Sequence, residues 1–284
     1  MVRIICWNMN KRAAAWHCLA EMAERGEVDV ALLQEAVCPP GDLGAQVLYK
    51  KNVHWDQPRY DRWSLVVQLS DRVKVEWFRQ VPPYQSVEEN EIGVSGIGTI
   101  AAARVVPHGR PEAAFVAVSM YARWMEPHPS TGSPWSTGAS DVSAHQILSD
   151  ISAFVGHPDP KKHRILAAGD LNMFRGATGK RLSLPEREST VWTRFEALGL
   201  EFLGPQAPDG RPAAPAQPEV PVDTLNVPTF RTSTQSPAEA NRQLDYVFAS
   251  RGFHEEVTVR ALNGTDEWGP SDHCRLAIEV GRHA

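Results

Sequence analysis

Residues 2–35 read VRIICWNMNKRAAAWHCLAEMAERGEVDVALLQE and contain the pattern from which the architecture follows. The β-branched and apolar run Val2–Trp7 predicts a strand, and Ala13–Arg25 predicts a helix with an apolar stripe that Gly26 ends. Val28–Leu33 predicts a second buried strand. Strands joined by a helix pair in parallel, so the polar residues that follow each strand reach the same edge of a sheet.

The remainder of the chain is rich in strand patterns. We expect strands at Trp63–Leu69, Val73–Phe78, Gly98–Val106, Ala113–Tyr121, Arg164–Ala168, Glu201–Leu203, Leu244–Ala249, Val257–Leu262 and Arg275–Val280. The first two, separated by Ser70-Asp71-Arg72, resemble a hairpin. Further helices are expected at Asp141–Val155, with Ser140 or Asp141 as N-cap, and at Thr190–Leu198.

Residues 204–221 contain six prolines and little that could pack, which predicts a loop. Many strands with helices outside them predict an α+β fold in which two mostly antiparallel sheets pack face to face and helices cover the outer faces. A length of 284 residues is compatible with one domain, and we assign residues 1–284 to a single domain.

Composition narrows the class of protein. A hydrophobic fraction of 42% and a charged fraction of 22% are typical of a globular protein. The sequence has no pattern of a secretory signal and no run of apolar residues long enough for a membrane span. Four cysteines without CxxC spacing are expected to be reduced thiols, which favours a cytoplasmic location. The net charge of −5 argues against a protein that coats polyanions, but it permits a nucleic-acid enzyme with an acidic metal site.

Polar residues gather at the ends of the predicted strands. They are Asn8, Asn10, Glu35, Tyr121, Arg123, Asp170, Asn172, Asp245, Ser271, Asp272 and His273. Amide and carboxylate oxygens suit hard cations such as Mg²⁺ or Mn²⁺ rather than zinc. A histidine beside carboxylates can transfer a proton or stabilise a phosphorane, so the set suits hydrolysis at phosphorus.

Each motif taken alone has a purely structural interpretation. Asn8 can turn the chain before the helix, and Glu35 can be an ordinary loop acid. Gly169-Asp170-Leu171-Asn172 can be an Asx turn, and Ser271-Asp272-His273 can be a polar turn. The functional interpretation therefore depends on the ordered set.

That ordered set resembles a known family. Cys6-Trp7-Asn8-Met9-Asn10, Leu33-Gln34-Glu35, Gly169-Asp170-Leu171-Asn172, Leu244-Asp245-Tyr246 and Ser271-Asp272-His273 resemble, in order, the signature segments of the endonuclease/exonuclease/phosphatase superfamily, which includes deoxyribonuclease-I-like and exonuclease-III-like enzymes. The resemblance spans nearly the whole chain and implies a four-layer α/β/β/α sandwich.

The resemblance also implies roles for individual residues. Glu35 would be the principal metal ligand for Mg²⁺ or Mn²⁺, assisted by Asn8 and Asp272. Asp170 would orient or deprotonate the attacking water, and Asn172 would hold the phosphate. His273 would bind the scissile phosphate, with Asp245 orienting its imidazole and Tyr121 close to the phosphate.

The chain departs from the family patterns where specificity is expected. Asn10 stands where exonuclease-III-like members often carry an aspartate. Arg242 stands where abasic-site endonucleases typically have a tryptophan, and Tyr121-Ala122-Arg123-Trp124 lacks the usual Tyr-x-Pro-Asn continuation. The loop Met125–Ser140 is expected at the rim of the site. We expect substrate contacts from Asn10, Arg123, Arg175 and Arg242, and further stacking or phosphate contacts from Trp55, Arg59, Trp63 and Trp124.

Three functions remain open on this evidence. The leading hypothesis is a Mg²⁺- or Mn²⁺-dependent nuclease that acts on DNA or RNA. The second is a phosphatase or phosphodiesterase that acts on a small or lipid phosphate of the inositol phosphate or sphingomyelin type; the absence of an amphipathic membrane-docking pattern disfavours the lipid version. The third is an inactive binding scaffold, which the complete set of catalytic residues disfavours. The sequence indicates no protein partner.

Overall fold

Two β-sheets form the centre of the computed structural model, which describes residues 1–43, 63–85, 87–96, 100–132, 139–179 and 185–281. The first sheet has the order β12 (Val257–Leu262), β13 (Arg275–Val280), β1 (Val2–Asn8), β2 (Val30–Ala36) and β3 (Trp63–Gln68). The second has the order β10 (Leu200–Gly204), β11 (Asp245–Ser250), β9 (Ile165–Asp170), β8 (Phe115–Tyr121), β7 (Ile100–Pro107) and β4 (Val73–Trp77). Within these sheets β1–β2 and β8–β9 are parallel and the other neighbours are antiparallel.

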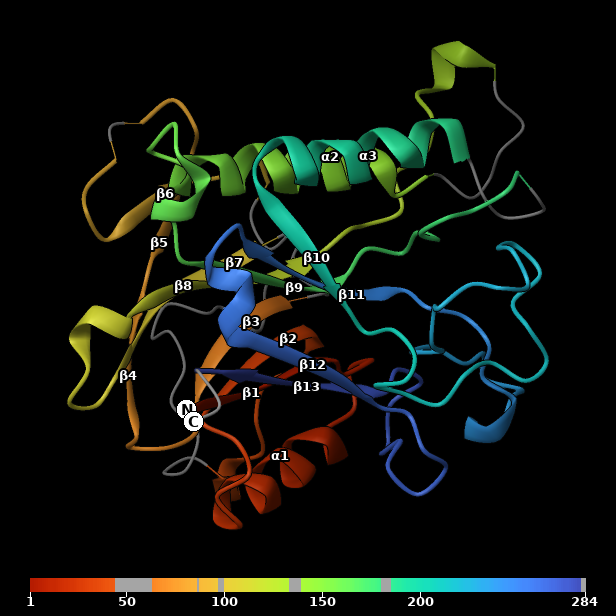
Figure 1. The fold of residues 1–284 in the computed structure, drawn as a ribbon, viewed down its shortest axis with the longest axis horizontal. Coiled ribbons are helices and arrows are strands. Elements are labelled where there is room, and N and C mark those ends of the chain that lie inside the picture. The colour runs from red at the N-terminus through yellow and green to blue at the C-terminus, as the bar shows by residue number, and fades with distance from the viewer. Residues whose placement is uncertain (44–62, 86, 97–99, 133–138, 180–184, 282–284) are drawn as a thin grey trace.

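Helices cover the outer faces of both sheets. Helix α1 (Ala14–Glu24) packs on the first sheet, and α2 (Asp141–Ile151) and α3 (Pro185–Ala197) lie side by side over the second (Figure 1). The expected α/β/β/α sandwich with mostly antiparallel sheets is therefore confirmed. A small parallel ribbon of β5 (Arg79–Val81) and β6 (Glu91–Gly93), which the sequence did not indicate, flanks it. None of the helices in the described part of the chain has the length and apolar content of a membrane span.

The central strands are apolar throughout because both of their faces are covered. In β1, Ile4 and Cys6 enter the core between the sheets, whereas Ile5 and Trp7 pack under α1. Side chains alternate along a strand, so a strand between a helix layer and a second sheet needs apolar residues on both faces. This explains why Val2–Asn8 has a single exposed residue, Arg3.

The predicted hairpin is wrong. Strand β3 pairs with β2 in the first sheet, and β4 pairs with β7 in the second, so residues 69–72 carry the chain from one sheet to the other. The Asp29 carboxylate accepts hydrogen bonds from Ser70 at 2.5 Å and Arg72 at 2.6 Å, which holds the crossing segment at the end of the first sheet. Val66 and Val75 both enter the core between the sheets. The alternation of apolar residues in β3 and β4 is therefore the same whether the two strands pair with each other or lie in different sheets.

The proline-rich residues 204–221 pack more closely than expected. Gln217, Glu219 and Val220 are nearly completely buried, and Val220 contacts Phe174 and Leu244 in a small apolar cluster. The expectation that this segment holds little that could pack is therefore wrong. Pro205 at its beginning is also buried, and Ala207 packs against the core between the sheets.

The strand directions bring polar residues to one edge of the sandwich. Strands β1, β2, β8 and β9 end at this edge, and β11 and β13 begin there. The N-terminus and the end of β13 lie at the opposite end of the sheets (Figure 1). We call the polar edge the catalytic edge.

Candidate active site

Two carboxylates and a histidine form a buried row at the catalytic edge. Asp170 at the end of β9 is directly opposite Asp245 at the start of β11. His273 Nδ1 lies 2.8 Å from Asp245 Oδ2, and His273 Nε2 lies 3.8 Å from Asp170 Oδ2. The first distance is that of a hydrogen bond. The second is too long for one, so Nε2 is near Asp170 Oδ2 but is not bonded to it. All three residues are at most 4% exposed.

The pKa values of Asp170 and His273 in this buried row are strongly shifted. Burial by itself lowers the pKa of His273, but the carboxylates of Asp245 and Asp170 outweigh it and raise this pKa from 6.5 to about 10. Burial raises the pKa of Asp170 from 3.8 to about 7, partly offset by His273. At neutral pH His273 is therefore a cation, and Asp170 exchanges between acid and carboxylate.

A second group of side chains joins Asp170 to the first sheet. Asn8 Nδ2 donates to Asp170 Oδ2 at 2.9 Å and lies 3.5 Å from Glu35 Oε1. The Tyr121 hydroxyl donates to the same Glu35 oxygen at 2.9 Å. The site is thus divided between the sheets, with Asn8, Glu35 and His273 from the first and Tyr121, Asp170 and Asp245 from the second.

The backbone at the catalytic edge is unusual. Asn10, Glu35 and Asn172 have φ values of 43°, 47° and 50°, a left-handed conformation that non-glycine residues rarely adopt. Asn172 is held there because its amide N donates to Asp170 Oδ1 at 2.8 Å and its Nδ2 donates to Ala122 O at 3.0 Å. The Asn10 amide N donates to Asn8 Oδ1 at 2.9 Å. These bonds fix the positions of the side chains that meet at Asp170.

Several supporting residues were not identified as functional from the sequence. Ser271 Oγ donates to Asn8 O at 2.7 Å, and Trp7 Nε1 donates to His273 O at 2.9 Å, so each holds the neighbouring motif. Thr229 Oγ1 accepts from the Asp245 amide at 3.1 Å, and Thr229 O accepts from Cys274 at 2.8 Å. Trp7 and Ser271 lie inside the quoted motifs, whereas no role was assigned to Thr229 from the sequence.

An aromatic residue next to the histidine was also missed. The Phe230 ring centroid lies 5.0 Å from that of His273. The Phe230 backbone forms isolated β-bridges with Arg242 and with His273. It packs against the apolar cluster of Phe174, Val220 and Leu244. The histidine is thus flanked by an apolar surface on one side.

The remaining predicted residues have different positions. Asp272 accepts from Ser271 Oγ at 3.3 Å and contributes to the raised pKa of His273, so it lies at the cluster. Arg242 Nη2 lies 3.4 Å from Glu219 Oε1 beside Phe230. Arg123 follows β8, two residues after Tyr121. Arg175 is not brought to the cluster, because its guanidinium lies 3.9 Å from the Phe202 ring centroid on the helix-covered side of the second sheet.

Parts of the predicted rim cannot be placed. Trp55, Arg59 and residues 133–138 of the loop Met125–Ser140 lie outside the described residues. Trp63 begins β3. Of the loop Met125–Ser140, residues 125–132, 139 and 140 are described.

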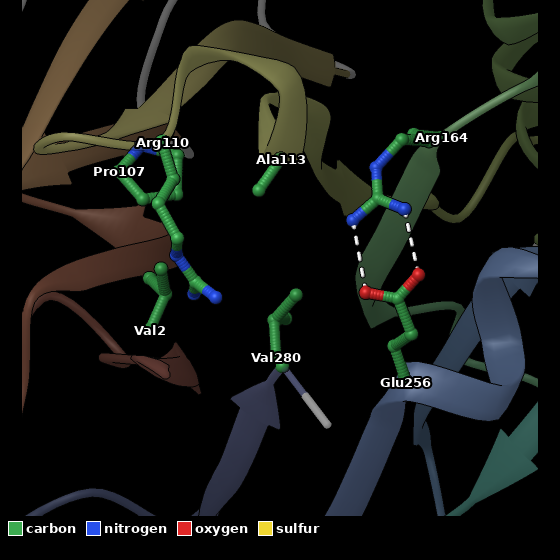
Figure 2. A pocket seen from close by; sticks show the side chains of 8 residues that line it. Val2, Pro107, Arg110, Ala113, Arg164, Glu256 and Val280 are labelled. Atoms are coloured by element: carbon green, nitrogen blue, oxygen red, sulfur yellow. Dashed lines mark hydrogen bonds and ion pairs between the residues drawn. The ribbon is translucent and has the colours of Figure 1, made fainter. Parts of the chain in front are cut away.

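A cavity lies away from the catalytic edge. It measures about 170 Å³ and lies at the opposite end of the sheets, between Val2, Pro107, Arg110, Ala113 and Val280 (Figure 2). There the Arg164 guanidinium binds both carboxylate oxygens of Glu256, at 2.7 and 3.1 Å. This pair ties the start of β9 to the start of β12, and we interpret the cavity as structural.

The oxygen donors at the catalytic edge have the chemistry of a hard-cation site. Within the described residues, no three His, Cys, Asp or Glu side chains converge as a complete metal-binding group. Glu35 and Asn8 lie side by side, and Asp272 joins the cluster through Ser271, whose hydroxyl also binds the Asn8 carbonyl. One or two carboxylates plus water and substrate phosphate is the coordination that Mg²⁺ favours. The residues present therefore fit such an ion.

The pair of His273 and Asp245 thus faces a second buried aspartate, Asp170, at the edge of an α/β/β/α sandwich. The model of the Endonuclease/Exonuclease/phosphatase family matches residues 5–273. The chain belongs to this family, whose members are hydrolases that act on phosphodiester bonds. No curated protein matches the sequence.

Solved structures show the same fold at low sequence identity. The catalytic domain of Xenopus laevis APE2 is 15% identical with a TM-score of 0.62, covering 99% of this chain and 92% of that one. The endonuclease domain of TRAS1, a telomere-specific non-LTR retrotransposon, is 18% identical with a TM-score of 0.59, covering 99% and 98%. The 3' phosphatase NExo from Neisseria, bound to a product DNA hairpin, is 12% identical with a TM-score of 0.57, covering 99% and 100%.

Proposed function

We propose that the protein is a Mg²⁺- or Mn²⁺-dependent phosphodiesterase that cleaves nucleic acid. The observation that carries the proposal is the position of the Asp170 carboxylate, which receives a hydrogen bond from Asn8 and lies 3.8 Å from the unbonded nitrogen of His273. A base and a cation that face the same small space are what hydrolysis of a phosphodiester needs.

The proposed reaction assigns one role to each group. Asp170 accepts the proton of a water molecule as the water oxygen forms its bond to phosphorus. The ester P–O bond breaks, and the leaving oxygen takes the bonding electron pair and a proton from solvent. His273 donates from Nε2 to a phosphate oxygen on which negative charge develops, while Nδ1 donates to Asp245. Asn172 and Tyr121 would lie beside the phosphate. A pKa of about 7 for Asp170 suits a general base at neutral pH.

The metal would be held by Glu35 and Asn8, with Asp272 assisting. When bound, a divalent cation polarises the phosphate and neutralises its charge. Tyr121 orients the Glu35 carboxylate through its hydroxyl, and Ser271 holds the Asn8 backbone. These contacts would preset the site for the ion.

Nucleic acid is the proposed substrate because the structural neighbours are named for nucleic-acid reactions and because arginines flank the site. Arg123 follows the strand of Tyr121, and Arg242 precedes that of Asp245. Arginine is the preferred side chain for contacts with a phosphate backbone. The four unpaired cysteines are consistent with a reducing compartment, so the proposal includes a cytoplasmic location.

The proposal is tested with a panel of substrates. Protein freed of metal with EDTA is given Mg²⁺, Mn²⁺ or no metal, together with plasmid DNA, single-stranded DNA, RNA, 3'-phosphorylated DNA or inositol phosphates. We expect metal-dependent cleavage of nucleic acid and a loss of about a thousandfold or more in Asp170→Asn. Asp150→Asn is the matched control, because Asp150 is also a buried carboxylate but binds Ser95 at the far end of α2. Release of phosphate from inositol phosphates alone would contradict the nuclease assignment, and full activity in EDTA would contradict the metal.

A further inference from the structure

Backbone atoms of the segment that follows β8 form hydrogen bonds with Asp170 and Asn172. The Ala122 amide donates to Asp170 O at 2.9 Å, and Ala122 O accepts from Asn172 Nδ2 at 3.0 Å. The next amide, that of Arg123, donates to Ser143 Oγ at 3.0 Å in the first turn of α2. The side chains of Arg123 and Trp124 therefore come directly after the point where the chain is bonded to Asp170 and Asn172.

Arg123 has hydrogen-bonding capacity that the protein does not use. Its Nε and Nη2 atoms are shielded from solvent, and no acceptor for them is found among the residues that the structure describes. A buried cationic donor without a partner is costly, and buried donors are nearly always satisfied. If the guanidinium turns toward solvent, the oxygens of a bound phosphate supply the acceptors that Nε and Nη2 lack.

Trp124 presents an apolar surface beside this arginine. Its side chain is 47% exposed, Met125 and Val142 are each 40% exposed, and Val142 adjoins the Ser143 that binds the Arg123 amide. An exposed tryptophan next to a phosphate-binding arginine is the combination that holds single-stranded nucleic acid, because any base can stack on the ring.

We propose that Arg123 and Trp124 form a subsite for the nucleotide next to the scissile phosphate, with Arg123 on its phosphate and Trp124 on its base. A base in a duplex is stacked on both faces, so the subsite takes an unpaired nucleotide. This rests on the proposed nuclease function and deepens it, because it makes the substrate a single strand or an unpaired end rather than an isolated phosphate or an intact duplex.

The kinetic experiment compares substrates with and without the neighbouring nucleotide. Methyl p-nitrophenyl phosphate has one phosphodiester and no base, a short single-stranded oligonucleotide fills the subsite, and its blunt duplex hides the bases. The ratio of kcat/KM for the single strand to that for the small diester should fall about ten- to a hundredfold in Trp124→Ala. Trp124→Phe should restore most of the loss, because a phenyl ring still stacks.

Arg123→Gln is tested through its dependence on salt. The slope of log affinity against log salt concentration for the single strand should become shallower by about 0.7, the value for one phosphate contact to a single strand. Tyr84→Ala and Arg104→Ala are matched controls: Tyr84 is 85% exposed in the turn after β5, and Arg104 pairs with Glu76 on the surface of β7 and β4. Both should leave the substrate ratio and the slope unchanged.

The outcomes separate the subsite from the proposed function. Equal losses on the oligonucleotide and on the small diester in Trp124→Ala would overturn the subsite, as would better cleavage of the blunt duplex than of the single strand. Binding of a labelled single strand to Asp170→Asn, measured by fluorescence anisotropy, does not require catalysis. If the wild type hydrolyses no phosphodiester but binding still depends on Trp124, the nuclease function fails and the subsite stands.

Discussion

Asp245→Asn tests the electrostatic core of the proposed mechanism. The substitution keeps the shape of the side chain and removes the negative charge 2.8 Å from His273 Nδ1. Asp245 is the strongest of the influences that raise the pKa of His273, and burial opposes them. Asp245 also raises the pKa of Asp170, so the substitution acts on both ends of the row.

The expected magnitude follows from the shift itself. Raising the pKa of His273 from 6.5 to about 10 corresponds to about 5 kcal/mol in favour of the imidazolium, at about 1.36 kcal/mol per pKa unit. Without Asp245, only Asp170 and Asp272 still oppose burial, so we expect the pKa of His273 to fall and more of its imidazole to be neutral at pH 8. Loss of this cation should lower kcat/KM at pH 8 by about a hundredfold to a thousandfold.

The pH profile distinguishes this loss from general damage. In the wild type kcat/KM should rise through about pH 7 as Asp170 ionises and fall near pH 10 as His273 loses its proton. The alkaline limb should move to lower pH in Asp245→Asn, because the charge that contributes most to the raised pKa of His273 is removed. The interaction that raises the pKa of His273 stabilises the fold fully below pH 6.5, and this stabilisation disappears as pH rises toward 10. The variant should lack that alkaline decline in stability. A folded variant with an unchanged alkaline limb and nearly full activity would refute the reasoning.

Three other substitutions test separate parts of the site. Glu35→Gln should raise the Mg²⁺ concentration for half-maximal activity by about ten- to a hundredfold, because it removes the principal anionic ligand; an unchanged metal titration would rule that role out. Tyr121→Phe removes the hydroxyl that orients Glu35 and should lower kcat by about tenfold or more with a normal melting temperature; equal activity would show that the bond is not needed. Gly169→Ala should destabilise the fold by about 4 kcal/mol or more in urea denaturation, because a Cβ at this position would overlap the Met120 backbone; wild-type stability would show that β8 and β9 can separate there.

Most of the fold could be predicted because its strands carry a local signal. Val2–Asn8, Ile165–Asp170 and Arg275–Val280 are apolar runs whose burial on one or both faces is visible in the sequence. The pairing of Trp63–Gln68 and Val73–Trp77 could not be predicted, because strands of a shared core have the same alternation whether they lie in one sheet or two. The crossing depends on Asp29, a contact distant in sequence.

Part of the site could also be predicted from the sequence, and part could not. Asn8, Glu35, Tyr121, Asp170, Asp245, Asp272 and His273 lie together at one edge, because each follows or begins a strand whose direction the pattern gave. Thr229, Phe230 and Glu219 were missed, since their contacts depend on how the residues between β10 and β11 fold back. The position of Arg175 over Phe202 depends on side-chain packing that sequence spacing does not encode.

The division of the site between the two sheets has a consequence during synthesis of the protein. A nascent chain that has emerged through β11 already contains Asn8, Glu35, Asp170 and Asp245, but it lacks His273 and the strand that pairs with β1. In the proposed mechanism His273 acts beside both carboxylates. Under the proposed nuclease function we therefore expect a ribosome-bound fragment to be inactive toward the RNA around it until its last strand has docked beside its first.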